Sequence, residues 1–349
     1  MAEGLSQLPD RKFQPPMALT CQERLLPKRV EKLLGWTVTL ARNANLTRSV
    51  NGRAPCHYCG PCARGLLYID RLTRESKEIY GRVIILCAQS YESVRILLNS
   101  ATRQYSSGLT NSSGVLGHYL TAHIRNAVAT GEMPTLGQEA SINGPFRPTG
   151  VYVARFRNMG KSRSKEFLRG YGYQGGAGAR FDWDAPGFGK DFRKAMAEAR
   201  ASASLTGFGE MLSRQDNFVE IDRDVVDAWG IPVLRIHLSD GPNEHAMAKD
   251  MAASATEMLE AAGATHVRPY VHPSAPRWAM HKVGIARMGN NPKTSVLNPF
   301  QQTHDIKNLF VMDGSCFVSL GCQNPTLTIM ALAVRSCDYL KGELKRGNL

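Results

Sequence analysis

The C-terminal part of the chain carries the strongest local signals for backbone structure. The apolar run Phe310–Met312 follows Asn308 and ends at the turn-forming residues Asp313-Gly314-Ser315, so a buried strand should end at Asp313. The side chain of Asn324 can accept from the amides of a first helical turn, and the fixed φ of Pro325 suits the first helical position. The sequence therefore predicts a helix that starts at Asn324. Apolar residues follow at helical spacing, at Leu327, Met330, Ala331 and Val334.

A single histidine precedes this strand, turn and helix. His281 lies in the segment Trp278-Ala279-Met280-His281-Lys282-Val283-Gly284. A neutral imidazole can act as a general base, although a lone histidine is more often a structural residue. The predicted helix N-terminus carries partial positive charge and would favour anionic density nearby. Taken with the Asp-Gly-Ser and Asn-Pro-Thr segments that follow, His281 is predicted to be catalytic.

In this order, the three segments resemble the C-terminal signature of the glucose-methanol-choline (GMC) family of FAD-dependent alcohol oxidoreductases. The resemblance implies that His281 faces the flavin and that Asn324 is its catalytic partner, a position held by histidine in some members and asparagine in others. It implies oxidation of a CH–OH group of an alcohol or sugar. Neutral His281 would accept the hydroxyl proton, hydride would leave to flavin N5, and Asn324 would hydrogen-bond the developing alkoxide.

The same resemblance implies a set of FAD-binding residues. Asp313 would bind the ribityl or phosphate region of the cofactor. The full predicted set is Asp313, Gly314, Ser315, Asn324, Pro325 and Thr326. The stretch from Ser295-Val296-Leu297-Asn298 to Cys316-Phe317-Val318-Ser319 is similar to gluconate-dehydrogenase-like members.

The expected fold class is α+β, with an incomplete FAD-binding α/β lobe and an antiparallel-sheet substrate domain of the GMC type. We expect an irregular N-terminal segment with a cysteine-rich loop (1–65) and a partial FAD-binding domain (66–120). The substrate domain would span 121–299, and 300–349 would complete the FAD-binding domain. His281 and Asn324 would meet at the boundary of the two lobes.

Periodicity also predicts several individual elements outside the C-terminal unit. Strands are expected at Leu66–Asp70, Glu78–Ala88, Phe218–Ile221 and Val233–Ser239. A helix should run from about Tyr91 to Asn99, and another should be capped by Asn243 and end at Gly263. Methionines recur on the second helix, and packing against a core explains them better than metal binding does.

Length and composition indicate a globular chain in a reducing compartment. The 349 residues are 43% hydrophobic, which suffices for one large or two moderate cores. No run of eighteen or more apolar residues appears, so no membrane span is predicted, and the first residues show no signal peptide. The eight cysteines are too sparse for a disulfide scaffold. We therefore expect a cytoplasmic location by default.

The formal net charge of +13 raises the question of anionic partners. The densest basic cluster comprises Arg155, Arg157, Lys161, Arg163, Lys165 and Arg169. No nucleic-acid recognition motif accompanies it, so a solvated basic face or a negatively charged redox partner is favoured over RNA. The predicted partners are a small alcohol or sugar substrate and an electron acceptor of unknown identity, without nucleic acid.

Two other motifs invite a cofactor or metal interpretation. Gly170-Tyr171-Gly172-Tyr173-Gln174-Gly175 satisfies GxGxxG, but the sequence before it is no buried strand and the sequence after it is no helix, so we expect a flexible loop. Cys56, Cys59 and Cys62 could hold zinc or an iron–sulfur cluster, since clustered thiolates are soft ligands. No second CxxC follows, and we predict a structural or redox-inert loop with no metal.

The family's N-terminal strand, glycine-rich turn and helix, which bind the ADP half of FAD, have no counterpart in this sequence. The resemblance covers the middle and C-terminal portions only. A second departure is Ala122, before His123, where relatives tend to have aspartate. The alternative to an oxidoreductase is therefore a truncated, non-catalytic remnant that does not bind FAD on its own.

Overall fold

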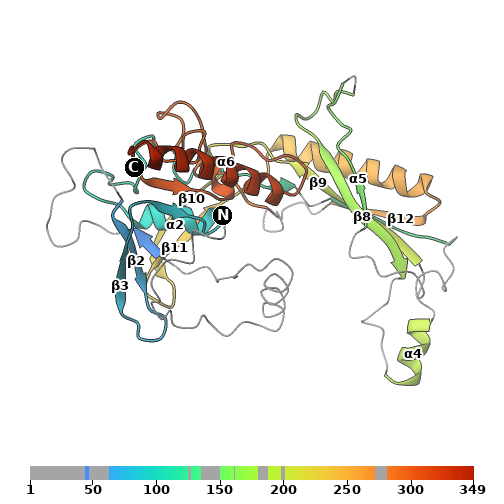
Figure 1. Cartoon of the computed structure of the whole chain (residues 1–349). Helices are drawn as coiled ribbons and strands as arrows, with labels where there is room; N and C mark the ends of the chain where they lie inside the picture. The colour runs from blue at the N-terminus through green and yellow to red at the C-terminus, as the bar shows by residue number, and fades with distance from the viewer. Residues whose placement is uncertain are drawn as a thin grey trace. The chain divides into compact units, whose positions relative to one another are not determined.

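The computed structural model describes residues 44–46, 63–124, 127–134, 150–160, 162–179, 188–197, 201–271 and 281–349 (Figure 1). Contacts group Ala44–Leu349 as one compact unit, and all elements named below belong to it. The cysteine-rich loop with Cys56, Cys59 and Cys62 lies outside the described residues. Helices combine with mostly antiparallel strands, which confirms the α+β class.

The largest sheet is six-stranded and antiparallel, in the order β12-β6-β9-β8-β7 with β5 also paired to β9. Its strands are β5 (His123–Ile124), β6 (Ala127–Glu132), β7 (Val151–Val153), β8 (Tyr171–Ala179), β9 (Ala201–Glu210) and β12 (Thr265–Val271). Helix α5 (Pro242–Ala261) packs along β6, β9 and β12, as Figure 1 shows. A short helix, α4 (Lys190–Ala197), precedes β9 in the chain.

Glycines of β9 make room for the methionines of α5. Met247 and Met251 are fully buried. A Cβ on Gly207 would lie 2.1 Å from Cε of Met251, and a Cβ on Gly209 would lie 2.8 Å from Sδ of Met247. The long thioether side chains therefore fill space that larger residues on the strand would occupy, which confirms their predicted packing role.

The start of α5 differs from the sequence prediction. Gly241, not Asn243, is the N-cap: its amide donates to the Glu244 carboxylate (2.8 Å), and Pro242 takes the first helical position. Asn243 lies inside the first turn, where its side-chain oxygen accepts from the amide of Leu168 (2.8 Å). The predicted end is correct, since Gly263 has a positive φ of 86° directly after the helix.

A second core surrounds a parallel pair of strands, β4 (Ile84–Leu86) and β13 (Leu309–Val311). Helix α2 (Ser90–Asn99) packs on this core with Val94 and Leu97 fully buried. The hairpin β10 (Phe218–Val226) and β11 (Pro232–His237) also contacts α2. As predicted, β13 is followed by Asp313, which caps the 3-10 turn η3 (Gly314–Cys316).

The predicted strand Glu78–Ala88 is two strands with different partners. The first, β3 (Ser76–Tyr80), pairs antiparallel with β2 (Gly65–Ile69), which also pairs with β1 (Ala44–Leu46). The second, β4, is parallel to β13. The amide of Gly81 bonds to Arg64 while that of Ile84 bonds to Asn308, so the break reflects a change of hydrogen-bonding partner that local apolarity does not reveal.

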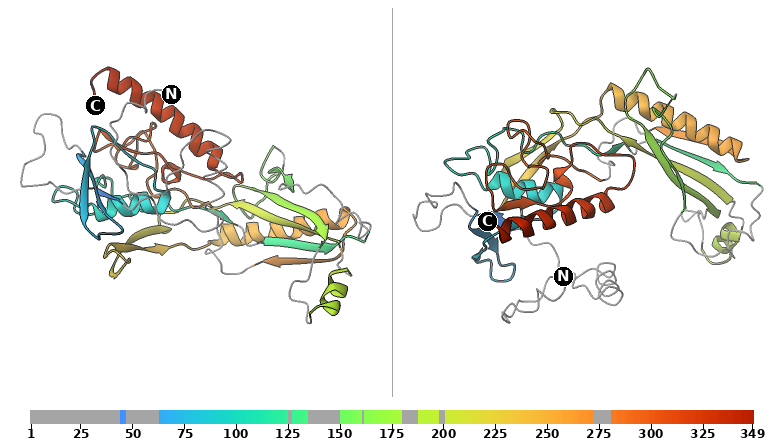
Figure 2. Two further views of the ribbon diagram at one scale, coloured as in Figure 1. Left: turned by 60° about the horizontal axis from the view of Figure 1, so that its bottom comes forward. Right: turned by 45° about the horizontal axis from the view of Figure 1, so that its top comes forward.

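Helix α6 (Thr326–Lys345) starts later than predicted. Pro325 is the N-cap residue, without a side-chain cap, and Asn324 lies before the helix. The predicted apolar stripe is also not the buried face. Leu327, Met330 and Val334 are 78%, 52% and 59% exposed, whereas Ser336 and Leu340 are buried. Figure 2 shows α6 along the outside of the described chain.

Removing a core methionine should cost much more stability than removing an exposed one. Met251→Ala leaves a cavity between α5 and β9, and we expect the free energy of unfolding to fall by about 2–5 kcal/mol. Met330→Ala, on the exposed face of α6, should change it by no more than about 0.5 kcal/mol. Urea denaturation followed by circular dichroism measures both. Equal effects of the two substitutions would contradict the assigned packing.

Candidate active site

The segment that begins at His281 lies between two other parts of the chain. Val283 exchanges backbone hydrogen bonds with Thr121, which lies two residues before β5 (2.9 and 3.0 Å). The amides of Gly284, Ala286 and Met288 donate to the carbonyls of Gly314, Ser315 and Cys316 (3.0, 3.0 and 2.9 Å). His281 is therefore positioned by the start of the large sheet and by the turn that follows β13.

The backbone around His281 adopts conformations that side chains seldom allow. His281 and Ile285 have φ values of 59° and 70°. Gly284 has a φ of 87°, and a Cβ there would lie 2.4 Å from the carbonyl oxygen of Tyr119. Non-glycine residues in this region cost energy and often occur at functional sites. The strain at His281 is thus consistent with a side chain held for chemistry.

His123 is the partner of His281. The Nδ1 atoms of the two rings are 3.0 Å apart, and the rings are nearly perpendicular with centroids 5.1 Å apart. The other nitrogen of His123, Nε2, lies 2.6 Å from the carbonyl oxygen of Gly321. His123 is fully buried, and burial lowers its pKa to about 4, with the nearby His281 adding to this decrease.

An ion pair between the buried Glu210 and the partly exposed Arg155 supports the loop that carries Gly321. Both carboxylate oxygens of Glu210 lie 2.9 Å from Nη1 of Arg155, and one of them accepts from the amide of Cys322 (3.2 Å). Glu210 is only 3% exposed, so this pairing compensates the cost of burying its charge. The ion pair therefore fixes the backbone next to the carbonyl that His123 contacts.

Asn324 lies on the same loop, three residues after Gly321. Its Oδ1 accepts from Nε2 of Gln174 on β8 (2.8 Å), so the sheet orients the amide. Asn324 and Thr326 are exposed, and Pro325 between them is buried. His123 thus contacts both the ring of His281 and the carbonyl of Gly321, which lies three residues before Asn324.

Asp313 is buried and uses its carboxylate inside the protein. One oxygen accepts from the amide and hydroxyl of Ser315 (2.9 and 2.6 Å), and the other accepts from the hydroxyl of Ser93 on α2. Burial raises the pKa of Asp313, while these hydrogen bonds act in the opposite direction. A Cβ on Gly314 would lie 2.9 Å from the Ser90 hydroxyl, so the turn passes close to α2.

Three residues of this arrangement were not predicted from the sequence: His123, Glu210 and Gln174. His123 follows Ala122, the position noted as a departure from relatives, but the histidine itself received no role. Glu210 and Gln174 lie on adjacent strands of an antiparallel sheet. Their relation to the loop at 321–324 depends on contacts between distant parts of the chain, and no local pattern reports it.

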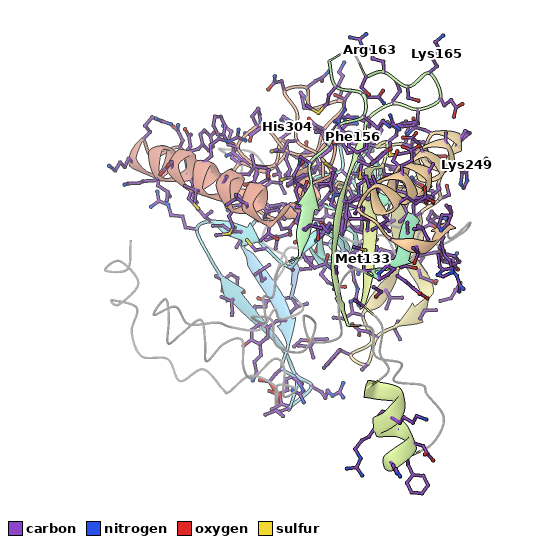
Figure 3. All side chains as sticks on the ribbon, turned by 90° about the vertical axis from the view of Figure 1, so that its right-hand side faces the viewer. Met133, Phe156, Arg163, Lys165, Lys249 and His304 are labelled. Carbon is purple, nitrogen blue, oxygen red and sulfur yellow. The ribbon has the colours of Figure 1, made fainter. Side chains whose placement is uncertain are left out.

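The basic cluster is partly used within the fold. Arg155 pairs with Glu210, and Arg157 bonds to both carboxylate oxygens of Asp250 on α5 (2.8 and 3.2 Å). Arg163 and Lys165 are exposed in the loop between β7 and β8, where Figure 3 shows them at its outer end. Lys161 lies outside the described residues.

The GxGxxG match at 170–175 is part of a strand. Tyr171–Ala179 is β8, paired on one side with β9 and on the other with β7. The expected flexible loop was wrong, because tyrosines alternate with glycines here in the two-residue period of a strand: Tyr171 and Tyr173 are fully buried. This position does not provide the strand–turn–helix context of a pyrophosphate site.

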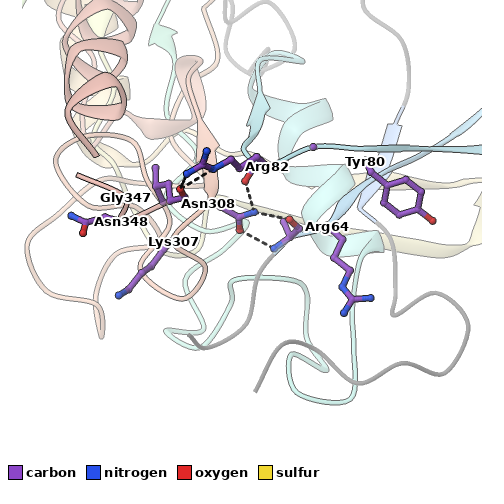
Figure 4. Close-up of a pocket in the computed structure, with 10 residues that line it drawn as sticks. Arg64, Tyr80, Arg82, Lys307, Asn308, Gly347 and Asn348 are labelled. Atoms are coloured by element: carbon purple, nitrogen blue, oxygen red, sulfur yellow. Dashed lines mark hydrogen bonds between the residues drawn. The ribbon is translucent and has the colours of Figure 1, made fainter. Parts of the chain in front are cut away.

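A cavity of about 580 Å³ lies away from His281, at the start of β4 and β13. Figure 4 shows Asn308 at its centre, where the side chain bonds to both backbone groups of Ala63 (2.9 and 2.6 Å) and to the carbonyl of Arg82 (3.0 Å). Since Asp313 follows the other end of β13, this cavity and the candidate active site are at opposite ends of the parallel pair.

The chain is similar to several known oxidoreductases. Residues 213–333 match the GMC oxidoreductase family. The chain is 34% identical over 317 residues to 2-methyl-1,2-propanediol dehydrogenase of Mycolicibacterium austroafricanum. The matched region covers 87% of this chain and 56% of that relative. It is 26% identical over 308 residues to the gluconate 2-dehydrogenase flavoprotein of Pantoea cypripedii, a match that covers 80% of this chain and 47% of that relative. The middle and C-terminal part of the chain belongs to the GMC oxidoreductase family.

The GMC oxidoreductases are FAD-dependent enzymes that act on CH–OH groups. Another relative is the large subunit of fructose dehydrogenase of Gluconobacter japonicus, 26% identical over 285 residues (78% of this chain and 50% of that relative). A formate oxidase of Aspergillus oryzae RIB40, studied for modification of its FAD, has a TM-score of 0.51 at 15% identity, over 82% of this chain and 58% of that chain. The last likeness shows the fold alone. The chain spans about half the length of the curated relatives it matches.

Among the described residues, no helix has both the length and the apolar character needed to cross a bilayer.

Acid should destabilise the protein through His123. Its pKa is about 4 in the folded state against an ordinary value of 6.5, so the unfolded chain binds a proton over this interval and the folded chain does not. The stability that depends on unprotonated His123 is complete above about pH 6.5 and is lost as the pH falls toward 4. Between pH 7 and 4, the free energy of unfolding of the wild type should drop by about 3 kcal/mol more than that of His123→Phe. Urea denaturation at several pH values measures this difference, and parallel pH profiles would contradict it.

Proposed function

We propose that this chain forms part of an FAD-dependent oxidoreductase that acts on a CH–OH group of an alcohol or sugar. The observation that carries the proposal is the placement of His281. Its backbone is held in a left-handed conformation, and its ring is bonded to His123, which in turn contacts the loop leading to Asn324. In a chain of the GMC family, this arrangement fits a general base facing a flavin.

The residues around the start of α6 fit the flavin end of the cofactor. The helix has no side-chain cap, so its first-turn amides are donors with partial positive charge, suited to the electron-rich N1/C2 edge of a flavin. Asn324, Pro325 and Thr326 would contribute to this edge. Asp313 holds the turn of Gly314 and Ser315 with its carboxylate, and we propose that this turn borders the ribityl or phosphate region.

When bound, FAD supplies the two-electron acceptor that takes hydride at N5. His281 accepts the hydroxyl proton of the alcohol as the C–H bond breaks, so the substrate leaves as a carbonyl compound. The amide of Asn324 donates a hydrogen bond to the developing alkoxide, and Gln174, bonded to the Asn324 oxygen, leaves the amide nitrogen to face it.

We further propose the two-lobe division described above, with 66–120 and 300–349 in the FAD-binding part and the middle of the chain as the substrate domain. The two separate cores support it, although Val283, Ile285 and Leu297 pack into the core of the FAD-binding part. The names of the relatives suggest small diols, fructose and gluconate as the first substrates to test.

Flavin binding distinguishes an oxidoreductase from a non-catalytic remnant. The full chain is purified, its absorbance in the flavin bands is recorded before and after addition of FAD, and oxidation of 2-methyl-1,2-propanediol, fructose and gluconate is assayed with an artificial electron acceptor. Flavin absorbance that remains after gel filtration, together with turnover of one of these substrates, supports the proposal. A protein that stays colourless after FAD addition would favour the remnant.

Substitution of the proposed base and its partner should affect turnover rather than cofactor binding. We expect His281→Ala to lower kcat by roughly 10²- to 10⁴-fold and Asn324→Ala by roughly 10²- to 10³-fold. Flavin absorbance of the His281 variant should remain as in the wild type. His118→Ala, which removes a histidine from the same segment as His123, serves as a control and should retain activity. Full activity of His281→Ala would rule out the assigned base.

A further inference from the structure

Three groups in series connect the loop at Gly321 to the proposed base: the Gly321 carbonyl, the ring of His123 and the ring of His281. The first contact is 2.6 Å, to Nε2 of His123, and the second is 3.0 Å, between the two Nδ1 atoms. Both are hydrogen-bond distances. The chemistry of these atoms restricts where the protons lie.

The Gly321 carbonyl determines which atoms donate and which accept in these two hydrogen bonds. A carbonyl oxygen only accepts, so Nε2 of His123 must carry a proton and donate it. In a neutral ring the other nitrogen, Nδ1, then has a lone pair and accepts. Because this Nδ1 faces Nδ1 of His281, the proton between the two rings belongs to His281.

The surroundings of His123 favour a neutral ring. The side chain is fully buried, the ring of Phe208 packs nearly perpendicular to it (centroids 5.4 Å apart), and burial lowers its pKa. Glu210 is the β9 residue opposite His123 in the sheet, but its carboxylate is bonded to Arg155 and to the Cys322 amide. The carboxylate of this cross-strand neighbour therefore already has a cationic partner.

We propose that His123 is a positioning residue that fixes neutral His281 in the tautomer with its proton on Nδ1 and its lone pair on Nε2. Its consequence for catalysis rests on the proposed function: Nε2 is then the atom that accepts the hydroxyl proton. After proton uptake, Nδ1–H of His281 still donates to His123, so the imidazolium keeps the same contact and the ring does not need to turn.

The tautomer can be measured without flavin or substrate. The full chain is labelled with 15N-histidine, and long-range 1H–15N correlation spectra are recorded near pH 7.5. His281→Gln identifies the His281 signals by their loss. We expect a protonated, pyrrole-type Nδ1 and a pyridine-type Nε2 for His281, and the reverse pattern for His123. A protonated Nε2 on neutral His281 would overturn the inference.

Two substitutions at His123 separate positioning from packing. His123→Phe keeps a ring but removes the acceptor, and the His281 signals should shift toward a mixture of tautomers. His123→Asn supplies an oxygen near the position of Nδ1, and the Nδ1–H tautomer of His281 should persist. His118→Phe makes the same chemical change in the same segment and should leave the His281 signals unchanged. An unaltered His281 tautomer in His123→Phe would contradict the assigned role.

Kinetics of the flavin-loaded protein provide the second measurement. His123→Phe should lower kcat by roughly 10- to 100-fold with a smaller change in KM, and His123→Asn should restore most of the loss. Turnover by the wild type with equal turnover by His123→Phe would refute the positioning role and leave the proposed function intact. Absence of flavin binding and turnover in the wild type would refute the proposed function, while the NMR spectra would still decide the tautomer.

Discussion

The parallel pairing of β13 with β4 is the interaction on which the candidate site depends. It begins where the carbonyl of Asn308 accepts from Ile84 and ends where the amide of Met312 donates to Leu86. Beyond that point the chain turns at Asp313, whose carboxylate is held by α2. The carbonyls of this turn then bind the segment after His281. This short parallel pair thus helps to determine the position of the proposed base, which is distant in sequence from β4.

Elements set by local residues could be predicted from the sequence. The turn at Asp313 after β13, helix α2 and the turn at Gly263 after α5 follow from apolar periodicity and turn residues. Elements that depend on distant partners could not. The run Glu78–Ala88 is uniformly suitable for a strand, yet its halves pair with different strands. The face of α6 that is buried is likewise chosen by its neighbours, and the most apolar stripe of this helix lies outside.

The same distinction applies to the site. His281 and Asn324 could be proposed because their motifs resemble a family signature. No motif assigned His123, which contacts His281 and the loop that leads to Asn324. His123, Glu210 and Gln174 act through contacts with a loop far along the chain. Histidine, glutamate and glutamine also occur as ordinary solvent-exposed residues and within strands. The sequence therefore holds no physical signal that marks these three as part of a site.

The packing of Met247 and Met251 against glycines of β9 affects how these residues can be oxidised. Thioethers are oxidised to sulfoxides, which are larger and polar, and the space beside Gly207 and Gly209 is already filled by the side chains themselves. Peroxide can reach these sulfur atoms only when α5 separates from the sheet. Sulfoxide formation at the two positions, measured by mass spectrometry, would therefore report how often α5 separates from the sheet.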